Sequence, residues 1–169
     1  MDDAEKRHVA ETVGIGAIKY ADLSHNRTSN YVFDMDKMVQ LEGNTSAYIQ
    51  YSYARTQSIL RKAAVQGWTE DRWHTSGLQV REPIEITLGL HLMRFEEALE
   101  QSMQEYLPSV ITDYLFETAR MFSSFFDQCP VLKADSESVG LSRLQLTALV
   151  GRTLKTGLKL LGIGVVDRM

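Results

Sequence analysis

The chain has 169 residues, of which 44% are hydrophobic and 24% are charged, and its formal net charge at pH 7 is −4. These values are typical of one globular domain with a true core, and they exclude a disordered chain or a disulfide scaffold. The negative net charge also argues against a protein that coats nucleic acid indiscriminately, although a net value hides the distribution of charge.

Cys129 is the single cysteine, so it has no partner for an internal disulfide and no neighbour at metal-ligand spacing. A lone thiol is typical of a reducing compartment, and we therefore expect a cytoplasmic protein. No apolar run reaches the roughly 18 residues of a membrane span, and the start, Met1–His8, is too highly charged for a secretory signal. We expect no membrane association.

The first predicted helix runs to Leu23. Its opening residues, Asp2–Glu5, place acids in the first turn, where the helix dipole favours them. Gly14 and Gly16 lie inside this helix and weaken it locally. Two glycines there indicate a kink or a close approach by another backbone.

A polar loop is predicted over residues 24–30, because this stretch contains no apolar residue. Tyr31–Phe33 follows and is the only segment with a strand-like composition, but it is too short to define a sheet. Asp34 can then cap a short helix over residues 35–41.

A tight polar turn over residues 43–46 leads into a long helix-forming run that reaches Lys62. Gly43 allows the turn, and side-chain oxygens that follow it can accept hydrogen bonds from first-turn amides, so we expect the helix to begin near Ser46. At about 100° per residue, this helix has two opposite faces. One face holds Tyr48, Tyr51, Arg55, Ser58 and Lys62, and the other holds Ile49, Tyr53, Thr56, Leu60 and Ala63.

The face that carries Tyr51 and Arg55 has the chemistry of an RNA-binding helix. Tyrosine rings can stack on bases, and arginine and lysine can neutralise phosphates. An ordinary amphipathic helix whose polar side happens to hold tyrosines is the other interpretation of the same pattern, and periodicity alone favours it.

Residues 67–81 lack a helical or alternating period, which predicts a hinge loop anchored on a helix face by Trp68 and Trp73. Pro83 suits the first position of the next helix. Helix-compatible apolar positions then continue without interruption to Tyr106, so we expect one long buried helix.

Two more helices complete the chain. The first starts at Pro108 and keeps three- and four-residue apolar steps to Phe126, and a proline-containing polar tract over 127–138 ends it. The last, over 139–161, has a leucine-rich side and a basic stripe. The stripe consists of Arg152, Lys155 and Lys159.

Charge is unevenly distributed. Residues 63–110 hold three basic and eight acidic residues, whereas residues 138–166 hold four basic residues and no acid. Such a layout permits one face to meet phosphate while another repels it, although a short basic cluster is more often a solvated helix surface.

The pattern as a whole predicts an all-α protein, a helical bundle with ordered loops. It has no glycine-rich phosphate loop, paired-histidine metal motif or nucleophile elbow. The four histidines have no helpful spacing, so we expect surface or core roles for them. We therefore predict no catalytic residue and no metal site.

Three groups of segments together resemble the arginyl-tRNA synthetases. Val13–Ser24 and His25–Asp34 are similar to the end of that family's catalytic region. A second group is similar to the loop and first helix of the family's anticodon-binding domain, and it consists of Leu41–Thr45, Tyr48–Tyr51 and Ala54–Arg55. A third group resembles the closing segments of the family, and it consists of Cys129–Leu132, Leu141–Leu144, Gly157–Leu158, Leu160–Ile163 and Asp167–Met169. The match covers nearly the whole chain in order.

The resemblance implies a fold and a domain division. The family's fold in this part is an all-helical anticodon-binding bundle of the class I synthetases, named after an Asp-Ala-Leu-Arg motif, and Leu141–Leu144 stands near that motif's place. We accordingly expect this bundle over residues 41–169. Residues 1–40 would be the end of the catalytic region, a remnant with its last helices.

The resemblance also implies a function. Such a domain binds the anticodon stem-loop of arginine tRNA, while the parent enzyme activates arginine with ATP, using Mg²⁺, and transfers it to the 3′ end of the tRNA. Family members carry their ATP- and arginine-activating motifs upstream of the segments seen here, so the chain looks like a C-terminal fragment without a cofactor of its own and inactive by itself. Its implied partners are arginine tRNA and the upstream catalytic domain. The alternative is a helical scaffold or protein-interaction module that binds no RNA.

Candidate RNA-binding residues come from both lines of reasoning. The resemblance implies that the turn and helix residues Gly43, Asn44, Thr45, Tyr51 and Arg55 approach the anticodon, with Phe126 and the terminal Met169 at its pocket. The alternative for Phe126 is that it only fills the core. The helix face adds Tyr48 and Lys62, and the basic stripe adds phosphate contacts from Arg152, Lys155 and Lys159.

One apolar surface of the first helix would pack partly on the catalytic domain of a complete enzyme. It consists of Val9, Val13, Ile15 and Ile18. Without that domain these side chains would be exposed, so we expect self-association through them.

Overall fold

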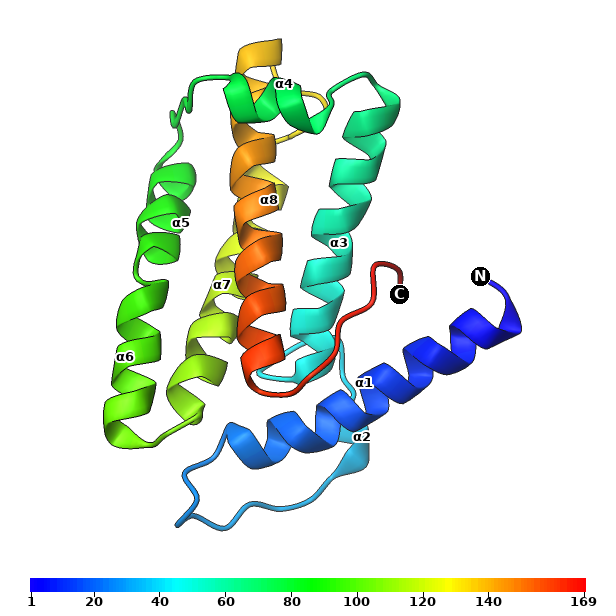
Figure 1. The fold of residues 1–169 in the computed structure, drawn as a ribbon, viewed down its shortest axis with the longest axis vertical. Coiled ribbons are helices and arrows are strands. Elements are labelled where there is room, and N and C mark those ends of the chain that lie inside the picture. Colours follow the sequence, from blue (N-terminus) through cyan, green and yellow to red (C-terminus); the bar gives the residue numbers. More distant parts are fainter.

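Eight helices and no strand make up the computed structural model, which describes residues 1–169. The all-α prediction is therefore confirmed. In chain order the helices are α1 (Asp3–Leu23), α2 (Met35–Met38), α3 (Ser46–Val65), α4 (Glu70–Thr75), α5 (Pro83–Met93), α6 (Phe95–Glu105), α7 (Ser109–Gln128) and α8 (Glu137–Leu160). Figure 1 shows α3, α5, α6, α7 and α8 running along the long axis, with α4 across one end of the bundle and α1 across the other.

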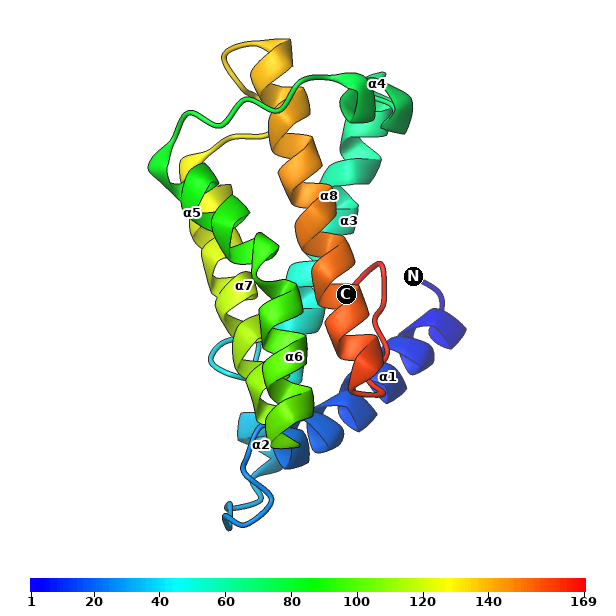
Figure 2. The same cartoon turned by 60° about the vertical axis from the view of Figure 1, so that its left-hand side comes forward.

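Helices α3 and α8 lie side by side at the centre of the bundle (Figures 1 and 2). As predicted, α3 begins at Ser46, because Thr45 caps it: the Thr45 Oγ1 accepts a hydrogen bond from the Tyr48 N–H at 3.1 Å. Gly151 of α8 permits the close approach of the two helices, since a Cβ there would lie 2.5 Å from the Thr56 Oγ1. A larger residue would force the helices apart.

The hydrophobic core lies between α3, α7 and α8. Fully buried apolar side chains from these helices include Ile49, Leu115, Phe122, Leu154 and Leu158. Burial of a side chain of this size contributes about 1.5–3 kcal/mol relative to its exposure. The apolar steps of α7 therefore reach the core as far as Phe122, and most leucines of the predicted apolar side of α8 do the same. Phe126 and Leu149 are exceptions, because both are exposed.

The base of the bundle is crossed by α1, which is continuous from Asp3 to Leu23. Its glycines have different roles. At Gly16 a Cβ would lie 3.0 Å from both the Gln50 Nε2 and the Ser46 Oγ, so the backbones of α1 and α3 approach closely there. At Gly14 a Cβ would meet nothing within 4 Å. The prediction of a close approach is confirmed for Gly16, and the helix continues without interruption through both positions.

The long helix predicted from Pro83 to Tyr106 is instead two helices, α5 and α6, which follow one another along α7 (Figure 2). The break is at Arg94, where φ is −87° and ψ is 10°. Tyr114 of α7 stabilises this break, because its hydroxyl donates to the His91 carbonyl at 2.8 Å. A helix break that depends on a side chain from another helix leaves no proline or glycine signal in the sequence.

The prediction that this region is buried is also wrong in part. Leu88 and Leu92 of α5 face the core, but Ile86, Leu90 and Met93 are exposed. Because α5 packs only on its α7 and α8 side, an apolar composition all round the helix does not mean burial all round.

Residues 67–81 are not entirely loop, because the short helix α4 lies within them. One and a half turns are too short for a hydrophobic period to be recognised. The anchoring role of the tryptophans is confirmed: Trp73 is buried, and Trp68 is half-buried with its ring against Gly140, where a Cβ would lie 2.5 Å from the indole.

The connection between α1 and α3 contains less regular structure than expected. Tyr31–Phe33 forms no strand, because no other extended segment lies beside it to pair with. Helix α2 ends at Met38 and does not reach Leu41. No helix in the structure is long and apolar enough to span a membrane.

Candidate RNA interface

A stacked group of three side chains marks the exposed surface between α3 and α7. The Cζ of Arg55 lies 5.0 Å from the centre of the Tyr51 ring and 4.8 Å from the centre of the Phe126 ring. The Arg55 Nη2 also donates to the Tyr51 hydroxyl at 3.1 Å. A guanidinium held between two rings keeps its planar donors in a defined orientation. No carboxylate lies within ion-pair distance of Arg55, so its charge is available to a ligand.

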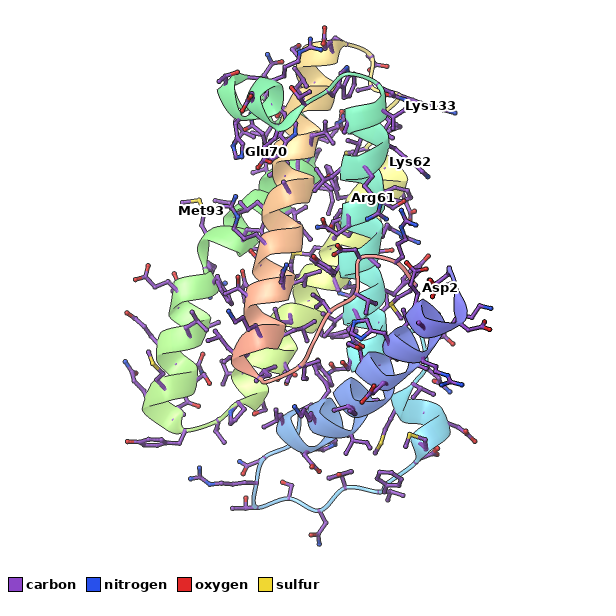
Figure 3. All side chains as sticks on the ribbon, turned by 45° about the vertical axis from the view of Figure 1, so that its right-hand side comes forward. Asp2, Arg61, Lys62, Glu70, Met93 and Lys133 are labelled. Carbon is purple, nitrogen blue, oxygen red and sulfur yellow. The ribbon has the colours of Figure 1, made fainter.

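A pocket of about 460 Å³ opens beside this stack. We call it the Arg55 pocket; its lining is Arg55, Ser58, Ile59, Lys62, Phe126, Pro130, Val131, Leu132 and Lys133. The lining includes three cations and no acid. Figure 3 shows Lys62 and Lys133 on the same edge of the molecule, one from α3 and the other from the segment after α7. Cations next to an aromatic ring and apolar side chains suit an unstacked base with its phosphates.

The predicted turn lies at the other end of α3, where Gly43 has the positive φ of 75° that a glycine tolerates. The Asn44 Oδ1 accepts a hydrogen bond from the buried Tyr20 hydroxyl at 2.6 Å. Its Nδ2 donates to Asp113, whose pKa is raised by burial. Together with the cap from Thr45, these contacts give the side chains of the turn local structural roles. The Gly43 carbonyl also accepts a hydrogen bond from the Thr45 N–H at 3.0 Å, although Gly43 itself is exposed.

Tyr48 does not lie on a free surface. It is half-buried, its ring meets the Phe116 ring edge-on at 6.0 Å, and its hydroxyl donates to the Ala119 carbonyl at 3.4 Å. The helical wheel places it on the polar face, but α7 covers this part of that face. Tyr48 therefore belongs to the contact between α3 and α7.

The basic stripe of α8 lies on the opposite flank of α3 from Phe126. Arg152 and Lys155 line a groove of about 490 Å³ between α3 and α8. A second groove, of about 670 Å³, contains Lys155 and Lys159 and runs along the C-terminal tail. The first groove also contains one carboxylate, Glu70, and the second contains two, Glu5 and Asp167. The structure thus separates the stripe from the Arg55 pocket, giving two basic surfaces of different character.

The C-terminal tail is held on α3 through Asp167. The terminal Met169 is exposed and does not line the Arg55 pocket. The Tyr53 hydroxyl donates to the Asp167 carboxylate at 2.9 Å, and the Arg61 Nη2 donates to the Asp167 carbonyl at 3.0 Å. Burial and the neighbouring Asp167 raise the pKa of Tyr53 to about 12, so its hydroxyl remains a donor at neutral pH. The buried Gln50 adds a bond to the Gly164 carbonyl at 2.7 Å.

Sequence reasoning missed three cations of these surfaces, which are Lys133, Arg61 and Arg168. Lys133 belongs to the irregular segment between α7 and α8, where no periodicity assigns a face. Arg61 lies on α3, but on the side covered by the tail, and its partner Asp167 is distant in the chain. The structure contains no group of three or more His, Cys, Asp or Glu side chains that could hold a metal ion.

Comparison with known proteins identifies two family models. Residues 49–169 match the DALR anticodon binding domain, and residues 1–35 match the catalytic domain of class I tRNA synthetases of the arginine type. The arginine–tRNA ligase of Rhodopirellula baltica is 54% identical over 176 residues, covering 100% of this chain and 26% of that protein. That of Proteus mirabilis is 45% identical, covering 100% of this chain and 29% of its own length.

Solved structures give the same result. The Thermus thermophilus arginyl-tRNA synthetase matches with a TM-score of 0.84 and 31% identity, over 97% of this chain and 28% of that one. The Plasmodium falciparum enzyme matches with a TM-score of 0.82 and 31% identity, over 96% and 28%. The chain spans little more than a quarter of the length of these relatives. It belongs to the family of DALR anticodon-binding domains, in the form found in arginyl-tRNA synthetases.

Proposed function

We propose that the chain binds the anticodon stem-loop of an arginine tRNA, and that the Arg55 pocket receives the anticodon bases. The observation that carries this proposal is the guanidinium of Arg55, which is held between Tyr51 and Phe126 at the mouth of a pocket with three cations and no acid. Bases that leave the stack need an aromatic or guanidinium plane to replace their neighbours. Phosphates that accompany them need cations, which Lys62 and Lys133 supply.

The other predicted residues have secondary roles in this proposal. Arg152, Lys155 and Lys159 contact phosphates of the stem, which adds affinity without sequence information. The exposed backbone at Gly43 and the Met169 side chain border the path of the RNA along α3. The matched family is defined by anticodon binding, which supports the assignment of RNA rather than another polyanion.

We further propose that a protein containing this chain is an arginine–tRNA ligase that acts in the cytoplasm, activates arginine with ATP and Mg²⁺, and transfers it to the tRNA. Support comes from the match of residues 1–35 to a synthetase catalytic domain and from the ligases that share 45–54% identity with the chain. The chain has neither a glycine-rich phosphate loop nor a cluster of metal ligands, so we assign none of its residues to ATP. Its role in the ligase is to hold the distal end of the tRNA.

Fluorescence anisotropy with labelled stem-loops tests the anticodon proposal. One RNA carries an arginine anticodon and another has the same stem with a changed anticodon, and both are titrated at several salt concentrations. We expect the arginine stem-loop to bind more tightly. Replacing Arg55 by alanine should weaken its binding by about 1–3 kcal/mol and reduce discrimination between the two RNAs.

Arg120→Ala is the matched control, because Arg120 is an exposed α7 arginine that pairs with Glu117 and touches no part of the Arg55 pocket. It should leave the affinity unchanged. Arg152→Ala should weaken both RNAs equally and lower the salt slope by roughly 0.9 if the contacted phosphate lies in a duplex. Equal binding of both RNAs by the unmodified chain, or no effect of Arg55→Ala, would contradict the proposal. A chain that ignores RNA and co-elutes with another protein would support the scaffold alternative.

A further inference from the structure

A buried ion pair lies behind the Arg55 pocket and makes no contact with its opening. The Nε of Arg143 in α8 donates to the Oε1 of Glu85 in α5 at 2.6 Å, and the two side chains are 8% and 0% exposed. The other carboxylate oxygen accepts from the backbone N–H of Arg81 at 2.7 Å and of Glu82 at 3.0 Å. Burial acts to raise the pKa of Glu85, but these hydrogen bonds and Arg143 outweigh it and lower the pKa. The pair is therefore ionised and well satisfied at neutral pH.

The guanidinium of Arg143 also makes a hydrogen bond outside the ion pair. The Arg143 Nη1 donates to the Pro130 carbonyl at 3.0 Å. This is the one side-chain hydrogen bond that the segment 130–135 receives, so its position depends on Arg143 and on packing. The packing is close: Val131 is buried, and a Cβ at Gly140 of α8 would lie 3.1 Å from the Val131 carbonyl.

The segment held in this way, Pro130–Lys133, forms one side of the Arg55 pocket. Lys133 lies at its end, and Arg55 and Lys62 of α3 lie on the opposite side. A rigid anchor for a loop that carries a ligand-binding cation reduces the conformational entropy lost on binding. A buried charge pair between two helices supplies such an anchor because its geometry is specific.

We propose that Arg143 is a positioning residue for RNA binding: it holds the Pro130–Lys133 side of the Arg55 pocket in place without touching RNA. The proposal rests on the proposed function of that pocket. It predicts that loss of the Pro130 contact will release the segment, displace Lys133 and weaken RNA binding while the helical bundle remains folded.

The double variant E85Q/R143M removes this contact together with the buried ion pair. It removes both charges together, which avoids an unpaired buried charge, and the glutamine amide oxygen can still accept the N–H groups of Arg81 and Glu82. R94M/E97Q is the matched control, because it makes the same chemical change at an exposed pair far from the pocket. Circular dichroism should show unchanged helix content for both variants.

Cys129 gives a readout that is independent of RNA. It is the only cysteine, it is fully buried, and it immediately precedes the segment. We expect an aromatic disulfide reagent to modify it at least about tenfold faster in E85Q/R143M than in the unmodified chain, because the reaction requires local opening. Binding of the arginine stem-loop should weaken by about tenfold, and its salt slope should fall by roughly 0.7 as Lys133 loses a single-strand phosphate. R94M/E97Q should change none of these quantities.

Thiol reactivity and RNA affinity together distinguish failure of the positioning role from failure of the proposed function. A thiol that stays protected in the folded double variant would overturn the positioning role, whatever happens to RNA binding. A reactive thiol with unchanged RNA affinity would overturn the link between this segment and the ligand. If the unmodified chain binds no stem-loop, the proposed function fails and with it the role in RNA binding, while the thiol measurement still decides whether Arg143 holds the segment.

Discussion

Gly151 controls how closely α8 approaches α3, the helix that carries the candidate site. We expect Gly151→Ala to destabilise the protein even though alanine is the better helix former. The new Cβ would lie 2.5 Å from the Thr56 Oγ1 and 3.2 Å from the Gln57 Nε2. Thr56 has no room to withdraw, because it is fully buried and its hydroxyl donates to the Tyr53 carbonyl at 2.7 Å.

The expected loss of stability follows from one favourable and two unfavourable effects. Alanine in place of glycine inside a helix is favourable by about 1 kcal/mol. Insertion of a methyl group into a packed contact costs about 1–3 kcal/mol. Loss of the Thr56 hydrogen bond costs about 0.5–1.5 kcal/mol more. The net destabilisation should therefore lie at roughly 0.5–3.5 kcal/mol.

Gly89→Ala is the matched control, because Gly89 is inside helix α5 and a Cβ there would meet nothing within 4 Å. This variant should be more stable than the unmodified chain by about 1 kcal/mol. Urea unfolding followed by circular dichroism measures both changes, provided that the m-values agree. The two glycine-to-alanine substitutions should therefore move the unfolding midpoint in opposite directions.

A further variant separates steric conflict from other causes. In a Thr56→Ala background the atom nearest to the new methyl group is gone, so Gly151→Ala should cost less than it does alone. The reasoning would be refuted if Gly151→Ala and Gly89→Ala were equally stabilising. It would also be refuted if removing the Thr56 hydroxyl left the cost of Gly151→Ala unchanged.

Burial lowers the pKa of His91 from 6.5, so the unfolded chain binds its proton more readily than the folded one does. The free energy of unfolding should therefore fall as the pH drops below about 6.5. In urea titrations between pH 7 and pH 5, His91→Gln should reduce this fall. An identical dependence of the unfolding free energy on pH in both proteins would argue against the prediction. Thr45→Ala removes the cap of α3 and should cost about 1 kcal/mol in the same assay, whereas an unchanged midpoint would mean that solvent replaces the cap. Ile15 and Ile18 are 48% and 41% exposed on α1, so the chain should self-associate at high concentration, whereas an I15S/I18S variant should stay monomeric. Sedimentation measures both, and a strictly monomeric unmodified chain would count against this prediction.

The helix boundaries that the sequence predicts well are those with local causes. Thr45 can cap α3 whatever the rest of the fold does, and Pro108 cannot continue a helix begun before it. The break at Arg94 is different, because Tyr114 of α7 stabilises it from outside. No property of residues 83–106 alone distinguishes one long helix from two. The division of the chain at residues 40 and 41 remains a prediction.

The candidate site shows the same difference between features with local causes and features that depend on tertiary packing. Helical periodicity correctly places Tyr51, Arg55 and Lys62 along one side of α3, because the angle between residues within a helix is known in advance. It does not show that α7 covers Tyr48 or that Phe126 completes the stack around Arg55. Those contacts depend on how one helix is rotated against another.

By itself, the sequence determines that the chain is helical, where most helices begin, and which family it resembles, because caps, apolar periods and motifs are local properties of the chain. Only the tertiary structure decides that Lys133 joins Arg55 in one pocket, that the basic stripe of α8 lies on the other flank, and that Arg143 lies behind the pocket. These relations join residues far apart in the chain. They depend on packing between elements, which no local pattern encodes.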